Sequence, residues 1–346
     1  MIHIEAAKMP GFQTLMGRMA AAGDTTLDVP DMALNIGGHG QGFIVKEALD
    51  WDPVANEDGT LGGALTLGDD VYLYAVADAS GVAQLVASKN ITVPDGYTAA
   101  ETRRIGGFHY GRWRPIAERY NKAYDPATII VPTSVWDQAH RPDCDPTGMV
   151  EVIPDQLWAD IYLNSEDGSP WPETVPLSRY DATPLSGSEG YSRYLDLPYL
   201  AANAGKRLPT VAEFFRYADG APEGGENDND TAWSDTSNSS RTATGTVAKA
   251  VSCVGVVDPA GNLWEPTLDH YDEAGTDNWD RTIVENGKDS SELRGEIRHA
   301  RWRFWVAGGS WGVGAWCGAR CANASNLPEH VHRYSGLRCV APARRQ

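Results

Sequence analysis

Four tryptophans gather near the C-terminal end of the sequence, and they constrain the fold more than any other feature. They are Trp302, Trp305, Trp311 and Trp316, out of twelve in the chain. An indole side chain is costly to expose unless it is buried or contacts a partner. We therefore expect this region to form core or binding surface.

The length of 346 residues predicts two units, one larger than the other. Residues 1–100 are rich in β-prone segments, and residues 101–346 contain more Trp and Pro with mixed helix and loop signals. Within the first part, residues 71–77 and 82–87 flank a short Gly-containing turn and predict a β-hairpin. The glycine-rich residues 35–42 lack the Gly-Lys-Ser/Thr ending of a phosphate-binding loop, so they predict a plain loop.

The formal net charge of −18 argues against non-specific binding to nucleic acid or to anionic lipid. The sequence starts without a basic segment followed by an apolar run, so we expect no signal peptide and synthesis in the cytoplasm. No run approaches the roughly 20 apolar residues that a membrane-spanning helix needs. We therefore expect no membrane insertion.

Five cysteines are an odd and sparse set, which does not indicate a disulfide scaffold. Cys317 and Cys321 lie four residues apart, but no second pair or nearby His completes a zinc site. Residues 155–163 and 197–204 have the apolar spacing of short helices. Residues 223–240 and 272–291 are polar and predict solvated loops.

Three segments carry a family resemblance. Residues 205–213 read Gly-Lys-Arg-Leu-Pro-Thr-Val-Ala-Glu, in which Thr210 and Glu213 can form a capping box at a helix start. Residues 258–265 read Asp-Pro-Ala-Gly-Asn-Leu-Trp-Glu, and Gly308-Gly309-Ser310-Trp311 precedes a closing Gly336-Leu337-Arg338. In this order the segments resemble the formylglycine-generating-enzyme family. The resemblance implies an α+β, C-type-lectin-like fold of the formylglycine-generating-enzyme type, preceded by a smaller β-rich N-terminal domain.

The catalytic groups of that family are missing from the matching positions. That family binds copper through two cysteines, which lie five residues apart after a Gly-Gly-Ser segment. This chain has Val313 at the first of these positions, and Cys317 lies one residue away from the second. The His-x-x-x-His-x-Glu iron triad of related sulfoxide synthases is not found. The resemblance thus implies no catalytic residue and no cofactor. Several family members hold calcium near the second segment, so the resemblance makes Asn262 and Glu265 candidate calcium ligands, although a purely structural turn is the favoured interpretation.

Residues 301–340 resemble the variable region of diversity-generating-retroelement proteins, in which adenine-containing codons, many of them for Asn, are rewritten. The resemblance implies that varied side chains project outward while core residues between them fix the backbone. The candidate ligand-binding positions are Phe304, Ser310, Gly312, Val313, Trp316, Ser325, His330, His332, Tyr334 and Ser335. For Trp316 and Phe304 the alternative is burial in the core. For His330 and His332 the alternatives are an exposed loop, which is favoured, and a metal site, for which no third ligand is apparent.

Residues 94–111 resemble a segment that recurs in phage tail and virion-associated proteins. We therefore expect a non-catalytic binding protein, displayed by a virus or provirus as in a tail fibre. Its C-terminal surface would bind a protein or glycan of the host surface, and residues 1–100 would attach to virion components. Two alternatives stay open: an enzyme of the formylglycine-generating-enzyme type with an unrecognised site, and a static structural virion protein.

Overall fold

The computed structural model describes residues 6–38, 40–223, 239–271, 280–284, 294–299 and 303–345. The chain divides into two compact units. The first comprises residues 1–111, 128–141 and 344–346, and the second comprises residues 112–127 and 142–343. The sequence places a boundary near residue 100, whereas the chain leaves the first unit at Gly111, inside a strand.

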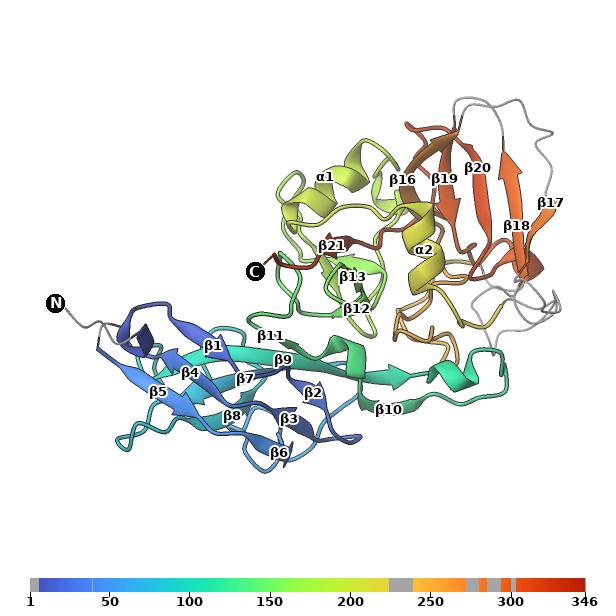
Figure 1. The fold of residues 1–346 in the computed structure, drawn as a ribbon. Helices are drawn as coiled ribbons and strands as arrows, with labels where there is room; N and C mark the ends of the chain where they lie inside the picture. The colour runs from blue at the N-terminus through green and yellow to red at the C-terminus, as the bar shows by residue number, and fades with distance from the viewer. Residues whose placement is uncertain are drawn as a thin grey trace. The chain divides into compact units, whose positions relative to one another are not determined.

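The first unit is built from β-sheets around one hydrophobic core (Figure 1). Its strands are β1 (Gln13–Leu15), β2 (Ala20–Ala21), β3 (Leu27–Val29), β4 (Met32–Asn35), β5 (Gly42–Val45), β6 (Ala48–Trp51), β7 (Asp69–Val76), β8 (Gln84–Ser88), β9 (Thr102–Trp113), β10 (Ala127–Ile130) and β11 (Trp136–Asp137). They form sheets in the orders β1-β4-β5, β2-β3-β6 and β10-β9-β7-β8, with β11 also paired to β9. The ends of β9 and β10 extend into the second unit.

The predicted hairpin is confirmed. Strands β7 and β8 pair antiparallel, with Tyr72 opposite Ser88 and Val76 opposite Gln84. Alternate β7 residues, Val71, Leu73 and Ala75, enter the core, as the two-residue period of a strand requires. The glycine-rich segment links β4 to β5 as a loop, as predicted, and its His39 lies outside the described residues.

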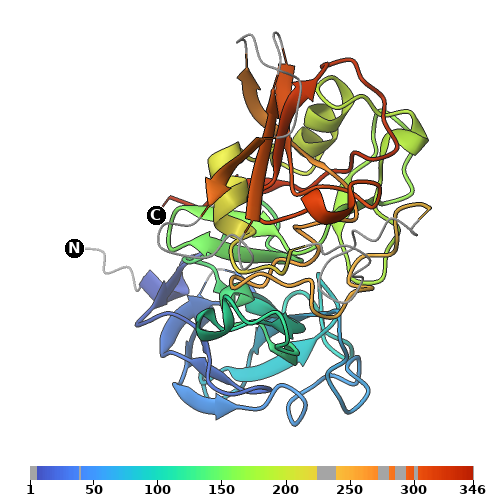
Figure 2. The same cartoon turned by 90° about the vertical axis from the view of Figure 1, so that its right-hand side faces the viewer.

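The second unit is mostly β-structure with two short helices among the residues that the structure describes (Figures 1 and 2). The strands are β12 (Met149–Ile153), β13 (Leu157–Asp160), β14 (Asn164–Glu166), β15 (Pro176–Ser178), β16 (Glu265–Tyr271), β17 (Asp280–Val284), β18 (Arg294–His299), β19 (Arg303–Ala307), β20 (Ala322–Asn326) and β21 (Val340–Pro342). The largest sheet has the order β16-β19-β20-β18-β17, in which β18 and β20 are parallel. The C-terminal β21 closes the sheet β12-β13-β21.

The helix predicted over residues 155–163 is wrong. Residues 157–160 form β13, which pairs antiparallel with β12 on one side and with β21 on the other. All four residues of β13 are buried, including Asp160. A strand covered on both faces loses the polar–apolar alternation of a half-exposed strand, so its short apolar run resembles a helix.

Both other helix predictions are confirmed. Helix α1 (Asp196–Asn203) lies over the predicted residues 197–204, and α2 (Val211–Tyr217) follows Thr210. The Thr210 side chain accepts a hydrogen bond from the amide of Glu213 at 3.2 Å, and the Glu213 carboxylate accepts one from the amide of Thr210 at 2.7 Å. Phe214 and Tyr217 are fully buried, so α2 is fixed by its cap and by its apolar side.

Replacing Thr210 with alanine is expected to lower the free energy of unfolding by about 1 kcal/mol, because the amide of Glu213 loses its partner. Thr210→Ser keeps the hydroxyl group and serves as the matched control. Urea unfolding followed by circular dichroism measures both variants. Equal stability of the alanine and serine variants would show that the cap contributes little.

Much of the two predicted polar loops lies outside the described residues, namely residues 224–238, 272–279 and 285–293. Strand β17 falls inside the second of these loops and pairs with β18. Over the described part of the chain, no helix combines the length and apolar character needed to cross a membrane.

Candidate functional site

Two of the motif segments, and the helix that begins in the third, meet at one buried side chain, Arg338. Its Nε donates to Glu265 at 2.9 Å, and Tyr217 donates to the other carboxylate oxygen of Glu265 at 2.5 Å. The two terminal nitrogens of Arg338 donate to the carbonyls of Asp160, Ile161 and Val257 at 2.7–3.1 Å. None of the Arg338 side chain is exposed, and 1% of Glu265 is.

This arrangement explains why the three motifs occur together. Tyr217 ends α2, Glu265 begins β16, and Arg338 precedes β21. A guanidinium group has five donors in a fixed plane, so it can join several backbone segments while it pairs with one carboxylate. The motifs therefore form a buried scaffold that joins segments far apart in the chain.

Two glycines fix the backbone just before Trp311. Gly308 and Gly309 have positive φ angles of 87° and 93°, which a residue with a Cβ rarely adopts. A Cβ at Gly308 would lie 2.4 Å from the carbonyl oxygen of Pro259, and one at Gly309 would lie 2.4 Å from Cys317 Sγ. The loop that follows is thus pressed against the turn at 258–262, where the Trp311 amide donates to the Asn262 carbonyl at 2.9 Å.

The two residues considered for calcium are both engaged within the chain. The Asn262 side chain accepts from the amide of Thr242 and donates to its carbonyl, each at 3.2 Å. Glu265 is held by Arg338 and Tyr217. In the described residues these oxygens have protein partners, and no group of three or more His, Cys, Asp or Glu side chains is arranged to hold a metal ion.

The cysteines of this region are buried thiols. Cys317 Sγ donates to the Ser310 carbonyl at 3.3 Å, and burial raises the pKa of Cys317 to about 12. Burial also raises the pKa of Cys339 well above its usual value. A reactive cysteine needs a lowered pKa and access to solvent. Neither thiol has the lowered pKa and the access to solvent that a reactive cysteine needs.

Several predicted ligand-binding residues are exposed or half-buried, and the rings of three of them lie together. Tyr334 stacks on His332 with ring centroids 4.6 Å apart, and His332 lies 5.5 Å from His330. Tyr334 and Val313 pack against the same buried cluster, and a Cβ at Gly312 would lie 2.8 Å from the Tyr334 ring. Trp316 ends the short 3₁₀ helix η5 (Gly314–Trp316) and is 47% exposed. We call Gly312, Val313, Trp316, His330, His332 and Tyr334 the aromatic face.

The rings of this face rest on a cation and a buried indole. Tyr334 lies 4.3 Å from Trp311, which is buried, and the Arg333 guanidinium lies 5.1 Å from the Trp311 ring and 5.2 Å from the Tyr334 ring. Cation–π contacts of this kind favour stacked, ordered side chains. The face is therefore ordered by its own packing.

His332 is a neutral group at neutral pH. Burial, followed by the positive charges of Arg193 and Arg333 and by His330, lowers the pKa of His332 to about 4. The amide of Tyr334 lies 3.3 Å from Nδ1 of His332. Nδ1 then accepts this bond, so the proton of the neutral ring is on Nε2, which can donate to a ligand.

The other predicted residues are not part of this face. Ser310 and Ser335 are buried, and Ser335 accepts a hydrogen bond from Nε of Arg193 at 2.5 Å. Phe304 lies on β19, where its ring centroid is 3.9 Å from that of Tyr194. Ser325 lies on β20 and donates to Asn323 at 2.6 Å. Phe304 and Ser325 belong to neighbouring strands, since Phe304 pairs with Asn326.

Arg193 is a structural residue of the site that the sequence did not reveal. It is 3% exposed and donates to Ser335 and to Asn326, so it joins the segment around Tyr334 to the end of β20. The adjacent Ser192 forms a β-bridge with Val331. No local pattern marks this role, because the partners of Arg193 lie more than 130 residues away along the chain.

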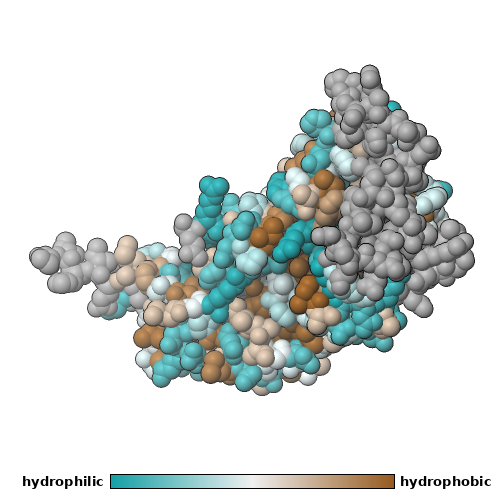
Figure 3. All heavy atoms as spheres, turned by 45° about the vertical axis from the view of Figure 1, so that its right-hand side comes forward, coloured by the Kyte–Doolittle hydropathy of each residue, from teal (hydrophilic) through white to brown (hydrophobic). Residues whose placement is uncertain are grey.

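Hydrophobic groups on the face drawn in Figure 3 form small patches separated by hydrophilic side chains. The exposed apolar residues near the aromatic face are Trp316 and Val331, which are 47% and 46% exposed. A surface of mixed polarity with a few exposed aromatic rings is typical of paratopes, which combine rigid rings with polar contacts.

Comparisons with known proteins agree in both sequence and fold. Residues 19–137 match the family described as the Mtd second domain. The chain is 33% identical over 175 residues to the tail fiber receptor-binding protein of Bordetella phage BPP-1, a match that covers 46% of the chain and 44% of that protein. The chain thus matches less than half of the length of this relative.

The solved structures match over a longer part of the chain. The M1 and I1 variants of the Major Tropism Determinant both superpose with a TM-score of 0.68 at 22% identity, and they cover 99% of this chain and 85% of theirs. At this identity the likeness shows the fold, which is mostly β with few helices. The chain is therefore similar to the major-tropism-determinant type of variable protein, which confirms the resemblance drawn from its sequence.

Proposed function

We propose that the chain is a non-catalytic receptor-binding protein of a phage tail fibre, and that its ligand contacts the aromatic face. The observation that carries the proposal is a set of rings, exposed at Trp316 and His330 and half-buried at His332 and Tyr334. They lie on loops whose backbone is fixed by Gly308, Gly309 and Arg338. Such a surface can change its side chains without changing its fold. A relative described as a tail fiber receptor-binding protein supports the same function.

The fold proposed for the second unit is a C-type-lectin-like fold of the formylglycine-generating-enzyme type. Support comes from the way in which two of the motif segments, and the helix that begins in the third, converge on Arg338. Residues 1–100 are proposed to attach the chain to virion components. Display of several copies on one particle would raise weak individual affinities through avidity.

Retroelement diversification is proposed for the ten positions named above. The aromatic face supports six of them as ligand contacts, whereas Ser310 and Ser335 are buried as they stand. Sequencing the gene and its 3′ flank in many clones tests the proposal. Substitutions confined to adenine-derived codons, with a near-copy of the segment nearby, are expected. An invariant C-terminal region would leave a static binding or structural protein as the better account.

Replacing Trp316 with alanine is expected to weaken binding to host envelopes by about 2 kcal/mol, or roughly thirtyfold, as for an exposed aromatic anchor. Equilibrium binding of the purified chain to envelopes of the host strain measures this change. Leu268→Ala, which removes a side chain that is 44% exposed on β16, is the control and is expected to bind normally. Equal binding by the Trp316 variant and the parent would remove the aromatic face from the proposal.

A further inference from the structure

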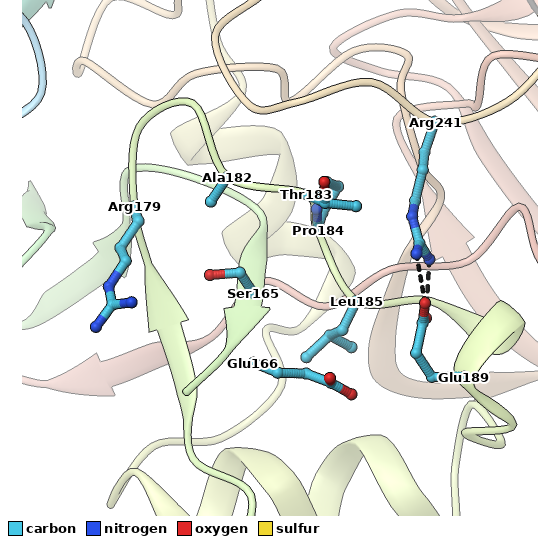
Figure 4. Close-up of a pocket in the computed structure, with 9 residues that line it drawn as sticks. All are labelled: Ser165, Glu166, Arg179, Ala182, Thr183, Pro184, Leu185, Glu189 and Arg241. Carbon is cyan, nitrogen blue, oxygen red and sulfur yellow. Dashed lines mark hydrogen bonds and ion pairs between the residues drawn. The ribbon is translucent and has the colours of Figure 1, made fainter. Parts of the chain in front are cut away.

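A second candidate site lies in the second unit, and none of the residues that line it falls within residues 301–340. Figure 4 shows a cavity lined by Ser165, Glu166, Arg179, Ala182, Thr183, Pro184, Leu185, Glu189 and Arg241. Its volume is about 350 Å³, which is within the range of small-molecule sites. None of these residues belongs to the predicted variable set, so the function proposed above does not account for the cavity.

The cavity is lined by charged groups of both signs. Arg241 forms an ion pair with Glu189, and its Nη1 lies 2.8 Å from one carboxylate oxygen. Although burial opposes it, this pairing with Arg241 holds the pKa of Glu189 below its usual value. The Arg179 side chain is exposed and makes no hydrogen bond or ion pair within the described residues. Figure 4 shows Arg179 and the Glu189–Arg241 pair on opposite sides.

The charged groups that line the cavity determine which polar groups a ligand needs. A guanidinium group only donates hydrogen bonds, and an ionised carboxylate only accepts them. A ligand that contacts both a guanidinium group and a carboxylate in one small cavity needs groups that can donate and accept hydrogen bonds, as hydroxyl groups do. The nearly balanced charge also disfavours a ligand with a strong net charge.

Aromatic rings adjoin the same cavity. Trp171 lies 5.9 Å from Tyr191 and 5.3 Å from Tyr199, measured between ring centroids. Trp171 and Tyr199 are 47% and 50% exposed. The Tyr191 hydroxyl donates to Glu166 at 2.7 Å. Because Glu166 lines the cavity, the ring cluster lies next to it. The faces of such rings carry partial negative charge and attract the weakly positive C–H groups of a sugar ring.

The cluster is held in place by the backbone around it. The Asn203 amide, at the end of α1, donates to the carbonyls of Pro172 and Thr174 at 2.7 and 2.9 Å. These bonds fix the segment that carries Trp171 against the helix that carries Tyr199. A ligand therefore meets rings that are already ordered, which lowers the entropic cost of binding.

We propose that this cavity and the Trp171–Tyr191–Tyr199 cluster form a carbohydrate-binding site for a neutral, hydroxyl-rich oligosaccharide. One sugar ring packs on the exposed Trp171 and Tyr199 rings, and the hydroxyl groups of the next enter the cavity between Arg179 and Glu189. The site shares no residue with the aromatic face, and binding there does not depend on Trp316.

Saturation-transfer NMR with the full chain tests the proposal against neutral di- and trisaccharides of glucose, galactose, mannose and N-acetylglucosamine. Isothermal titration then gives the Kd of each sugar that binds. Binding of at least one sugar is expected, with about tenfold loss in Tyr199→Ala and in Trp171→Ala, a change of about 1.4 kcal/mol. Glu166→Gln tests the cavity without removing a ring.

Two controls keep the outcomes distinct. Leu195→Ala removes an exposed side chain, 65% accessible, that is outside the ring cluster, and Trp316→Ala removes the ring of the aromatic face. Both are expected to bind the sugar normally. No binding by any sugar in the panel, or binding that persists in Tyr199→Ala and Glu166→Gln, would overturn the proposal. Sugar binding that is lost only in Trp316→Ala would move the site to the aromatic face and overturn it as well.

Discussion

Replacing Arg338 with methionine is expected to lower the free energy of unfolding of the second unit by about 3–5 kcal/mol. The change leaves the buried Glu265 carboxylate without its cation, and it leaves three backbone carbonyls without the donors that Arg338 provides. Denaturant unfolding followed by tryptophan fluorescence measures the effect. A midpoint close to that of the parent would show that water or a shifted side chain replaces Arg338.

A second arginine–glutamate pair provides the control. Arg207 and Glu213 are 2.6 Å apart, but 39% of the Arg207 side chain is exposed. Arg207→Met is therefore expected to cost no more than about 1 kcal/mol. The double variant Arg338→Met/Glu265→Gln removes the unpaired charge while it keeps an acceptor for Tyr217. It is expected to recover part of the stability lost in the single variant.

The second large effect concerns pH. Burial raises the pKa of Asp258 from an ordinary 3.8 to about 6, although its carboxylate accepts a hydrogen bond from the Gly245 amide at 2.9 Å. The folded chain thus holds the proton more tightly than the unfolded chain does. The contribution of Asp258 to the free energy of unfolding is fully present below pH 4 and is lost as the pH rises through about 6. The loss amounts to about 3 kcal/mol.

Asp258→Asn is expected to remove most of that loss and to be more stable than the parent at pH 7. Asparagine keeps an acceptor for Gly245 and tolerates the positive φ of 54° at this position. A smaller slope is expected to persist, because burial also raises the pKa of Glu265. Unfolding free energies measured from pH 4 to pH 7 test the prediction.

Asp181→Asn is the matched control, because Asp181 is exposed and has a similar φ of 52°. Its pH profile is expected to follow that of the parent. Parallel profiles for the parent and Asp258→Asn would mean that Asp258 does not carry the pH dependence.

Local signals predicted well those elements whose causes lie within a few residues. The capping box at Thr210 and Glu213 and the turn between β7 and β8 are of this kind. The prediction for residues 155–163 failed because β13 is buried on both faces, with β12 and β21 paired to its two edges. Strand β21 lies about 180 residues further along the chain, beyond any local pattern.

The candidate site shows the same division. The resemblance to a variable region implied that the side chains of Trp316, His332 and Tyr334 project outward, but it could not tell that Ser310 and Ser335 are buried. Ser335 is buried because Arg193 binds it from a distant segment. The ring cluster at Trp171 also depends on contacts between separate segments, which no spacing rule predicts.

The place of Arg338 in the chain has a consequence for synthesis. Arg338 and β21 leave the ribosome after almost all of the second unit, yet they complete its core. A chain that ends early, through a stop codon or a shifted reading frame anywhere in residues 301–337, lacks both. We expect such a product to stay unfolded and to be degraded. Reading-frame errors in the variable region would then be removed during synthesis, before a defective copy competes for assembly.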